Sequence, residues 1–257
     1  MKQRPLVEVQ GVSKVFDTGG EPMRALDPTS ISVEEGGFLS IVGPSGCGKT
    51  TLLKMIGGLI APTTGTIKMR DTLVRGPRDD ISFVFQGAVL LPWKTTLENI
   101  LLPIRVRRKV TEADRKRALD LIKMVGLVKF EDRYPSELSG GMQQRVSICR
   151  ALIQDPACLL LDEPFGALDA LTRENMNVFF NRLWHETGKT MIMVTHSIQE
   201  AVFLSTRVIV MSERPGQIVD EVTVPFDRAR TPSVIGTQKF GDVAGHIRTY
   251  FTDHAVE

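Results

Sequence analysis

The chain begins with alternating apolar and polar positions, the pattern of a strand that buries one face. Residues 6–10 alternate in this way, and residues 31–33 repeat the alternation before a glycine-containing turn at 35–37. Strands that are half exposed are common in antiparallel sheets. These two segments therefore predict a small antiparallel sheet.

Short apolar runs predict a second, buried sheet. Residues 38–42 form a mostly apolar run that leads into a glycine-rich stretch, and residues 51–56 then have helical character. Similar short runs lie beyond helical stretches further along the chain, at 157–161, 191–194 and 208–211. Buried runs separated by helices are typical of parallel strands, so the predicted fold is α/β with a mainly parallel sheet.

The spacing of apolar residues becomes helical in the middle of the chain. Residues 112–125 carry apolar side chains at helical spacing with charges opposite, and residues 142–153 form a second helical candidate. We expect residues 87 to about 136 to be a helical lobe inserted into a domain spanning 1–225. The tail, residues 226–257, contains no recognisable site, and we expect it to pack against the helical lobe.

Composition narrows the class of protein. The 257 residues have a formal net charge of +2, which argues against a nucleic-acid partner because such proteins usually carry a basic stripe. No run approaches the ~18 apolar residues of a membrane span, and the first residues lead into a strand rather than an apolar signal segment, so we expect a cytosolic chain. The three cysteines, Cys47, Cys149 and Cys158, are widely spaced and are expected to be reduced thiols.

A glycine-rich loop follows the apolar run 38–42. Gly43, Gly48, Lys49 and Thr50 match the pattern G-x-x-x-x-G-K-[ST], between a predicted strand and a predicted helix. In such loops backbone N–H groups bind nucleotide phosphates, the lysine reaches the β- and γ-phosphate oxygens, and the hydroxyl binds Mg²⁺. The predicted phosphate-binding residues are Gly43, Pro44, Ser45, Gly46, Cys47, Gly48, Lys49, Thr50 and Thr51. The alternative is a simple strand-to-helix turn, and the loop alone does not distinguish among the classes of nucleotide hydrolase.

Two carboxylate side chains directly follow the apolar run 157–161. Asp162 and Glu163 follow three leucines, at the place where a parallel sheet meets its ligand. Asp162 is expected to hold Mg²⁺ through water, and Glu163 to polarise the water that attacks the terminal phosphate. The alternative interpretation is a turn that caps a helix.

A second candidate anion site lies before these carboxylates. Ser139, Gly140 and Gly141 lead directly into a helix, whose first N–H groups attract anions. Two such sites are redundant in one chain unless the second acts on the nucleotide of a neighbouring molecule. The order of these segments resembles the ATP-binding-cassette ATPases, over roughly residues 5–225. Taken alone, Ser139–Gly141 is only a helix cap.

The resemblance implies roles for four further residues. Gln86 would contact Mg²⁺ and the attacking water, and His196 would hold the γ-phosphate and orient Glu163. Asp169 would lie in a loop, with Ala167 and Leu168, that crosses a dimer interface, and Phe16 would stack on adenine. The alternatives are a strand-end amide for Gln86, a structural role for His196, a helix N-cap for Asp169 and a core aromatic for Phe16.

The resemblance also implies partners. Two copies would close head to tail around two ATP molecules, each site combining the phosphate loop of one copy with Ser139 and Gly141 of the other. Residues 86–93 would receive a permease, and Leu91-Pro92-Trp93 with residues 96–100 resemble importers of nitrate, taurine and aliphatic sulfonates. For Trp93 the alternative is an internal turn of the lobe. We expect an ATPase on the cytoplasmic side of the cell membrane, associated peripherally with permease subunits and served by an external solute-binding protein.

Other classes of cassette protein are less favoured. A soluble cassette ATPase acting on nucleic acid or ribosomes usually has a coiled-coil insertion or a second cassette, and we expect neither here. A module that senses nucleotide without hydrolysing it fits poorly because Glu163 and His196 are both present. An exporter cassette is commonly fused to its membrane spans.

Overall fold

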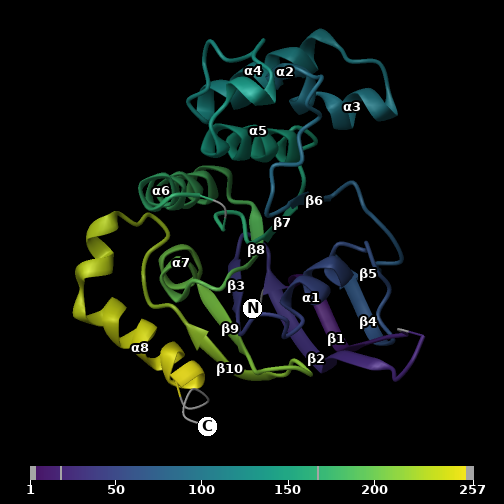
Figure 1. Ribbon diagram of the computed structural model, residues 1–257, viewed down its shortest axis with the longest axis vertical. Coiled ribbons are helices and arrows are strands. Elements are labelled where there is room, and N and C mark those ends of the chain that lie inside the picture. The colour runs from purple at the N-terminus through teal and green to yellow at the C-terminus, as the bar shows by residue number, and fades with distance from the viewer. Residues whose placement is uncertain (1–3, 18, 167, 253–257) are drawn as a thin grey trace.

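The computed structural model describes residues 4–17, 19–166 and 168–252. Residues 1–3, which the sequence places before the first strand, and Ala167 of the predicted aspartate loop lie outside the described residues. The elements run in this order: β1 Pro5–Phe16, β2 Met23–Glu34, β3 Phe38–Val42, α1 Lys49–Ile56, β4 Thr64–Met69, β5 Thr72–Leu73, β6 Ile81–Val84, α2 Thr96–Ile100, α3 Leu102–Arg107, α4 Glu112–Met124, η1 Pro135–Glu137, α5 Gly140–Leu152, β7 Cys158–Asp162, α6 Ala170–Thr187, β8 Thr190–Val194, α7 Ile198–Leu204, β9 Arg207–Met211, β10 Ile218–Thr223, η2 Pro232–Gly236 and α8 Gln238–Thr252 (Figure 1).

A six-stranded sheet forms the centre of the molecule. Its order is β10-β9-β3-β8-β7-β6, and every neighbouring pair is parallel except the edge pair β10 and β9. Every residue of β3, β7 and β8 is buried, which explains why these strands are short apolar runs in the sequence. The predicted mainly parallel sheet is confirmed.

The smaller sheet is antiparallel, as the alternating segments predict. Its order is β2-β1-β4-β5, and Val9 of β1 lies opposite Ile31 of β2 on one side and Ile67 of β4 on the other. These three side chains are buried in a cluster with Leu52 and Leu53 of α1 and with apolar residues of β3. Helix α1 is therefore packed between the two sheets.

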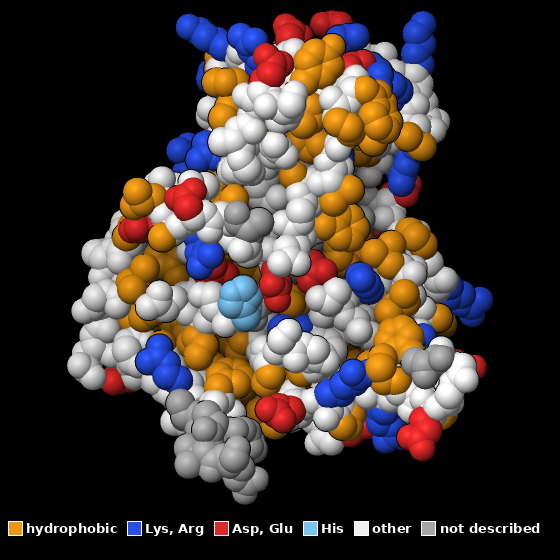
Figure 2. Space-filling model, in the orientation of Figure 1, with side chains coloured by type: hydrophobic (Ala, Val, Ile, Leu, Met, Phe, Trp, Pro, Cys, Tyr) orange, Lys and Arg blue, Asp and Glu red, His pale blue; other side chains and the backbone are white. Residues whose placement is uncertain are grey.

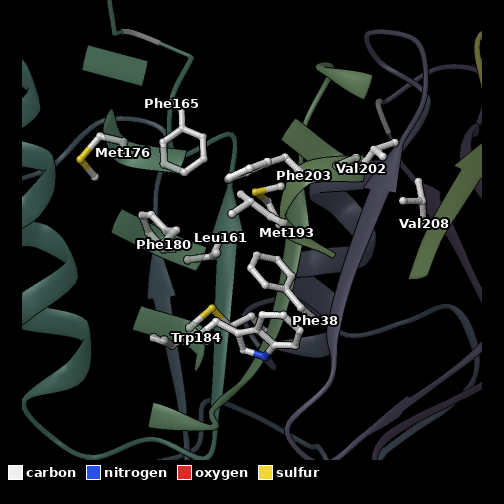
Figure 3. Packing of buried hydrophobic residues seen from close by; sticks show 14 of the residues in the cluster. Phe38, Leu161, Phe165, Met176, Phe180, Trp184, Met193, Val202, Phe203 and Val208 are labelled. Atoms are coloured by element: carbon white, nitrogen blue, oxygen red, sulfur yellow. The ribbon is translucent and has the colours of Figure 1, made fainter. Parts of the chain in front are cut away.

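Helices α6, α7 and α8 cover the opposite face of the large sheet. Several aromatic side chains lie in this layer: the rings of Phe38 and Trp184 meet edge to face at 5.6 Å, and those of Phe165 and Phe180 at 5.1 Å (Figure 3). The Trp184 indole N–H donates to the Gly36 carbonyl oxygen at 3.0 Å, so the buried ring leaves no unpaired donor. This packing fixes α6 on one face of the sheet whose strands lead to the candidate site.

The helical lobe stands at one end of the molecule, above the edge strand β6 and its neighbour β7 (Figure 1). It has its own apolar core, to which α2 contributes Ile100, α4 contributes Ile122 and α5 contributes Val146, with Ile153 directly after α5. Helices α2 and α4 each begin with a reciprocal capping box, Thr95 with Glu98 in α2 and Thr111 with Asp114 in α4.

The tail packs against the sheet domain, and the prediction that it packs against the helical lobe is wrong. Phe240, Ala244 and Ile247 of α8 are buried in the same cluster as residues of α7, far from the lobe (Figure 1). The buried Arg230 guanidinium donates to the carbonyl oxygens of Val202 and Phe203. The core of the lobe is already filled by its own helices, including α5. Helix α7 offers an apolar face and, at its C-terminal end, carbonyl groups without partners inside the helix, and the tail covers both.

Within the part of the chain that the structure describes, no helix combines the length and the apolar character that crossing a membrane requires.

Candidate functional site

The phosphate loop connects β3 to α1 in the predicted arrangement. Gly48, the residue before α1, has φ +103°, and a Cβ atom added there would lie 2.7 Å from the Ala25 carbonyl oxygen. Only glycine fits this close approach in a left-handed conformation. Glycine also offers no side chain to cap the first N–H groups of α1, so these donors remain available to an anion.

Lys49 lies folded into the loop. It is 5% exposed, and its Nζ donates to the carbonyl oxygens of Gly43 at 2.8 Å and Pro44 at 2.6 Å. Nζ also lies 3.7 Å from Cys47 Sγ. These neutral carbonyls are acceptors that phosphate oxygens can replace with a stronger, charge-assisted bond.

Two oxygen groups from distant parts of the sequence meet beside the loop. Thr50 Oγ1 donates to Asp162 Oδ1 at 2.7 Å, and the Asp162 residue is 8% exposed. The hydroxyl and carboxylate oxygens form the hard donor set that Mg²⁺ prefers, and they leave room for phosphate and water oxygens to complete its coordination. Among the described residues, no group of three or more His, Cys, Asp or Glu side chains could hold a metal without such outside ligands.

Glu163 and His196 lie side by side at the ends of β7 and β8. His196 Nδ1 is 3.3 Å from Glu163 Oε2, and the side chains are 60% and 25% exposed respectively. Glu163 has φ +44°, and its backbone N–H donates to the Val194 carbonyl oxygen at 2.9 Å. The pair is therefore open to a ligand while its backbone is fixed by the sheet.

Gln86 follows β6 and approaches the same edge from the other side. Its side chain is exposed, and a Cβ added to Gly166 would lie 3.2 Å from Gln86 Nε2 and 3.6 Å from Glu163 Oε2. The amide and the carboxylate thus flank one glycine. The structure brings Gln86 to the predicted place, at the point where the chain leaves the sheet for the helical lobe.

Two pockets border the phosphate loop on the face where acidic side chains gather between the lobes (Figure 2). The first has a volume of 260 Å³ and is lined by Phe16, Met23, Ala25, Ser45, Gly46, Gly48, Lys49, Thr50, Thr51, Glu163 and Arg214. The second has a volume of 400 Å³ and is lined by Val42, Gly43, Pro44, Ser45, His196, Ile198, Glu213, Tyr250 and Phe251. Phe16 therefore faces the loop, with Lys14 Nζ 5.1 Å from its ring centroid.

Several of these lining residues are absent from the sequence prediction. Met23 and Ala25 come from β2, Arg214 from the turn between β9 and β10, and Tyr250 with Phe251 from α8. The Arg214-Pro215-Gly216 turn after a buried strand is the one signal that could have indicated a basic residue at this edge. The others are placed only by tertiary packing.

Ser139, Gly140 and Gly141 lie apart from the phosphate loop, in the helical lobe. Ser139 is the N-cap of α5, and its hydroxyl accepts from the Met142 N–H at 3.3 Å. Ser139 and Gly140 are exposed, and none of the three is among the described residues that line either pocket. One chain therefore does not bring its own two anion sites together.

Asp169 is the N-cap of α6. Its carboxylate accepts from the Thr172 N–H at 3.0 Å, and the pKa of Asp169 is lowered by hydrogen bonds from the hydroxyl and the N–H of Thr172. A Cβ added to Gly141 would lie 2.5 Å from Thr172 Cγ2. The start of α5 thus packs on the start of α6, next to Asp169.

Trp93 lies on the surface of the helical lobe. It is 68% exposed, and nearby Val89 is 66% exposed. The alternative that Trp93 belongs to an internal turn is therefore wrong. The exposed apolar pair follows Gln86 by a few residues and is continuous in the chain with the candidate site.

Comparison with known proteins identifies relatives along most of the chain. The family model described as "ABC transporter" matches residues 26–166. A taurine import ATP-binding protein of Jannaschia sp. is 43% identical, covering 85% of this chain and 82% of the relative. A bicarbonate transport ATP-binding protein of Synechocystis sp. is 41% identical, covering 89% and 82% respectively. A solved dimeric ATP-binding cassette in a post-hydrolysis state, bound to ADP and Pi, superposes with a TM-score of 0.75 at 38% identity, covering 86% of this chain and all of that one.

Proposed function

The chain belongs to the ABC transporter family and is an ATPase, and from that premise we propose that it drives the uptake of a solute through a separate membrane permease. The observation that carries the proposal is the meeting of three distant segments at one edge of the large sheet. These are the phosphate loop with Lys49 and Thr50, the carboxylates Asp162 and Glu163, and His196. ATP hydrolysis requires groups of these types within reach of one phosphate chain.

In the proposed site, the triphosphate lies along the loop 43–50 and at the start of α1. Lys49 exchanges its loop carbonyls for β- and γ-phosphate oxygens, and Phe16 stacks on the adenine. Thr50 and, through water, Asp162 would hold Mg²⁺, with Gln86 as a further oxygen ligand, and the ion would supply positive charge beside the phosphates. The 2.7 Å contact between Thr50 Oγ1 and Asp162 Oδ1 supports this assignment because it already brings the two proposed ligand oxygens together.

Glu163 and His196 serve the hydrolytic step. Glu163 orients the attacking water and accepts its proton as the new oxygen–phosphorus bond forms, and ADP leaves with the electrons of the broken bond. His196 donates to a γ-phosphate oxygen and, through the 3.3 Å contact of its ring, holds the Glu163 carboxylate in place. The products are ADP and phosphate.

The site is completed by a second copy of the chain. Ser139, Gly140 and Gly141 lie outside the pockets of their own chain, although the exposed N-terminus of α5 is suited to bind phosphate. In the proposed dimer they bind the γ-phosphate held by the partner's phosphate loop, and Asp169 lies at the interface between the copies. Binding of two ATP molecules closes the dimer, and hydrolysis releases it.

Closure moves the helical lobes, and the exposed segment around Val89 and Trp93 transmits that movement to the permease. The chain would act peripherally, on the cytoplasmic side of the membrane, with two permease subunits and an external solute-binding protein. The names of the relatives point to small anionic or zwitterionic solutes such as taurine or bicarbonate. Relatives named as aliphatic sulfonates importers support alkanesulfonates in the same way, and nitrate stays a prediction from the sequence. Relatives of similar identity carry different solute names, which is expected if the permease and binding protein select the solute.

Replacing the proposed water-activating carboxylate tests the function. Glu163→Gln retains the shape of the side chain but removes the proton acceptor, so the rate of ATP hydrolysis should fall by at least about a hundredfold. Size-exclusion chromatography with Mg-ATP should then show a stable dimer, because closure is retained and its release is blocked. Unchanged turnover, or a variant that stays monomeric with Mg-ATP, would remove Glu163 from this role.

A further inference from the structure

A buried carboxylate lies behind the catalytic pair. Glu200, in the first turn of α7, is 6% exposed, and its Oε2 accepts from Thr195 Oγ1 at 2.6 Å. The same Thr195 oxygen accepts from the Ser197 N–H at 3.0 Å. Thr195 and Ser197 are the two neighbours of His196 in the chain. Glu200 therefore fixes the backbone on both sides of His196 without touching the imidazole.

The other carboxylate oxygen of Glu200 faces α6. Arg173 Nε is buried and, within the described part of the chain, has no hydrogen-bond partner, yet it lies only 3.8 Å from Glu200 Oε1. A shift of about 1 Å would convert this ion pair into a charge-assisted hydrogen bond. Arg173 Nη2 also donates to the Leu168 carbonyl oxygen at 3.1 Å. Leu168 belongs to the segment that runs from Glu163 to Asp169, so Arg173 connects that segment to Glu200.

These contacts close a ring around the site. From Glu163 the chain runs to Leu168, whose carbonyl binds Arg173. Arg173 pairs with Glu200, Glu200 holds Thr195, and the next residue, His196, returns to Glu163 at 3.3 Å. We propose that Glu200 is a positioning residue for ATP hydrolysis, which sets His196 opposite Glu163 by holding the two segments that carry them. This inference rests on the roles proposed above for Glu163 and His196.

A purely structural role for Glu200 would require its carboxylate to stabilise the fold. The backbone N–H of Glu200 is already bound by the Ser197 hydroxyl at 3.3 Å, so capping α7 does not need the carboxylate. Burial raises the pKa of Glu200, which means that the charged form is the costly one to keep inside the protein. A neutral replacement of the same shape should therefore not lower the stability of the fold. The presence of a carboxylate at Glu200 is explained by its contacts with Thr195 and Arg173.

Steady-state kinetics of two variants measure the effect. Glu200→Ala removes both contacts, and kcat for ATP hydrolysis should fall about tenfold while KM for ATP changes by less than about twofold, because the nucleotide contacts are intact. Glu200→Gln retains an acceptor for Thr195 but loses the charge facing Arg173, so kcat should fall by about threefold with an unchanged or higher melting temperature. The contact is also testable from its other end: Thr195→Val should lower kcat as Glu200→Ala does, and Thr195→Ser should restore it.

Glu174 supplies the matched control. It lines the same 390 Å³ cavity as Arg173 and Glu200, but it is exposed and lies outside the ring, so Glu174→Gln should leave kcat unchanged. A Glu200→Ala variant that folds and hydrolyses ATP at the wild-type rate would overturn the inference. So would a Glu200→Gln variant whose loss of kcat is matched by a lower melting temperature. If Glu163→Gln is inactive while Glu200→Ala is normal, only this inference fails; if Glu163→Gln is fully active, the proposed function fails with it.

Discussion

Glu163 combines an unfavourable backbone conformation with a carboxylate that a ligand can reach. Its φ of +44° is rare for a residue with a Cβ atom and costs about 1–3 kcal/mol. The surroundings hold it there: its N–H donates to Val194 on β8, and its carbonyl oxygen accepts from Gly166 at 3.1 Å. The chain thus turns away at the end of β7, which leaves the carboxylate beside His196. Strain of this kind is typical of sites where the position of one group matters more than local stability.

Cys47 is a residue whose accessibility should report on nucleotide binding. It is 1% exposed, with Sγ close to Lys49 Nζ inside the phosphate loop. Alkylation therefore requires the loop to open. Bound Mg-ATP should hold the loop closed, and we predict that it slows labelling of Cys47 by N-ethylmaleimide at least about fivefold. Mass spectrometry of the peptide that contains Cys47 measures the rate.

The other two cysteines serve as internal controls for this experiment. Both are buried, and burial raises the pKa of the Cys149 thiol and raises that of Cys158 to about 12. Neither should form the reactive thiolate while the protein is folded, with or without nucleotide. Equal labelling of Cys47 in the presence and absence of Mg-ATP would contradict the prediction.

At the scale of the elements, the start of α2 depends on one carboxylate. Glu98 accepts from Lys94 Nζ at 3.0 Å, from the Thr95 N–H at 3.2 Å and from Arg105 at 3.2 Å. These contacts, that of Lys94 first, lower the pKa of Glu98 to about 2. A carboxyl whose pKa is lowered in the folded state stabilises the fold above its unfolded pKa and loses that contribution as the pH falls through the folded value. The contribution of Glu98 should therefore disappear between about pH 4.5 and pH 2.

Glu98→Gln should accordingly lower the melting temperature at pH 7 by about 2 °C, a modest change because Glu98 is partly solvated. The difference from wild type should shrink as the pH is lowered toward 3. Thermal unfolding followed by circular dichroism at several pH values measures both effects. Asp120→Asn, which removes an exposed carboxylate from the neighbouring helix α4, should show neither. A difference that grows on acidification would have the wrong sign for this explanation.

The strands of the sheet domain were predictable because burial restricts which residue types a strand can contain. A strand buried on both faces is mostly apolar, as β3, β7 and β8 are, and a half-exposed strand alternates, as β2 does over residues 28–34. Helix α8 shows the limit. Its apolar side chains Phe240 and Ile247 need a partner surface, but their spacing does not say which one, and they pack beside α7 rather than on the lobe.

The candidate site was predictable where local chain geometry creates the chemistry. The phosphate loop and the carboxylates Asp162 and Glu163 need only a strand and the turn that follows it. The ring through Arg173 and Glu200 was missed because its contacts join α6, α7 and two loops. A glutamate near the start of a helix is most often a cap, and nothing in its sequence context shows that its carboxylate reaches back to Thr195.

At the scale of the whole molecule, the exposed segment 89–93 should be a docking surface rather than part of the ATPase. We predict that Trp93→Ala abolishes copurification with the permease subunits and leaves the ATPase rate of the isolated chain within about twofold of wild type. Val106→Ala is the control, because Val106 is 78% exposed on the same lobe but belongs to α3. Loss of permease binding in both variants, or in neither, would contradict a specific role for Trp93.

The separation of the two anion sites within one chain predicts complementation between inactive copies. Lys49→Ala removes the phosphate-binding amine, and Ser139→Trp blocks the start of α5, so each variant alone should lose most of its ATPase activity. In a mixed dimer both defects fall in one site, and the other site combines an intact Lys49 with an intact Ser139. Equal mixing should form mixed dimers in about half of the assemblies, each with one working site, and should restore about a quarter of the wild-type rate. The rate is measured by phosphate release, with dimer formation checked by chromatography. If each site were built within one chain, every copy in the mixture would carry a defective site and no activity would return.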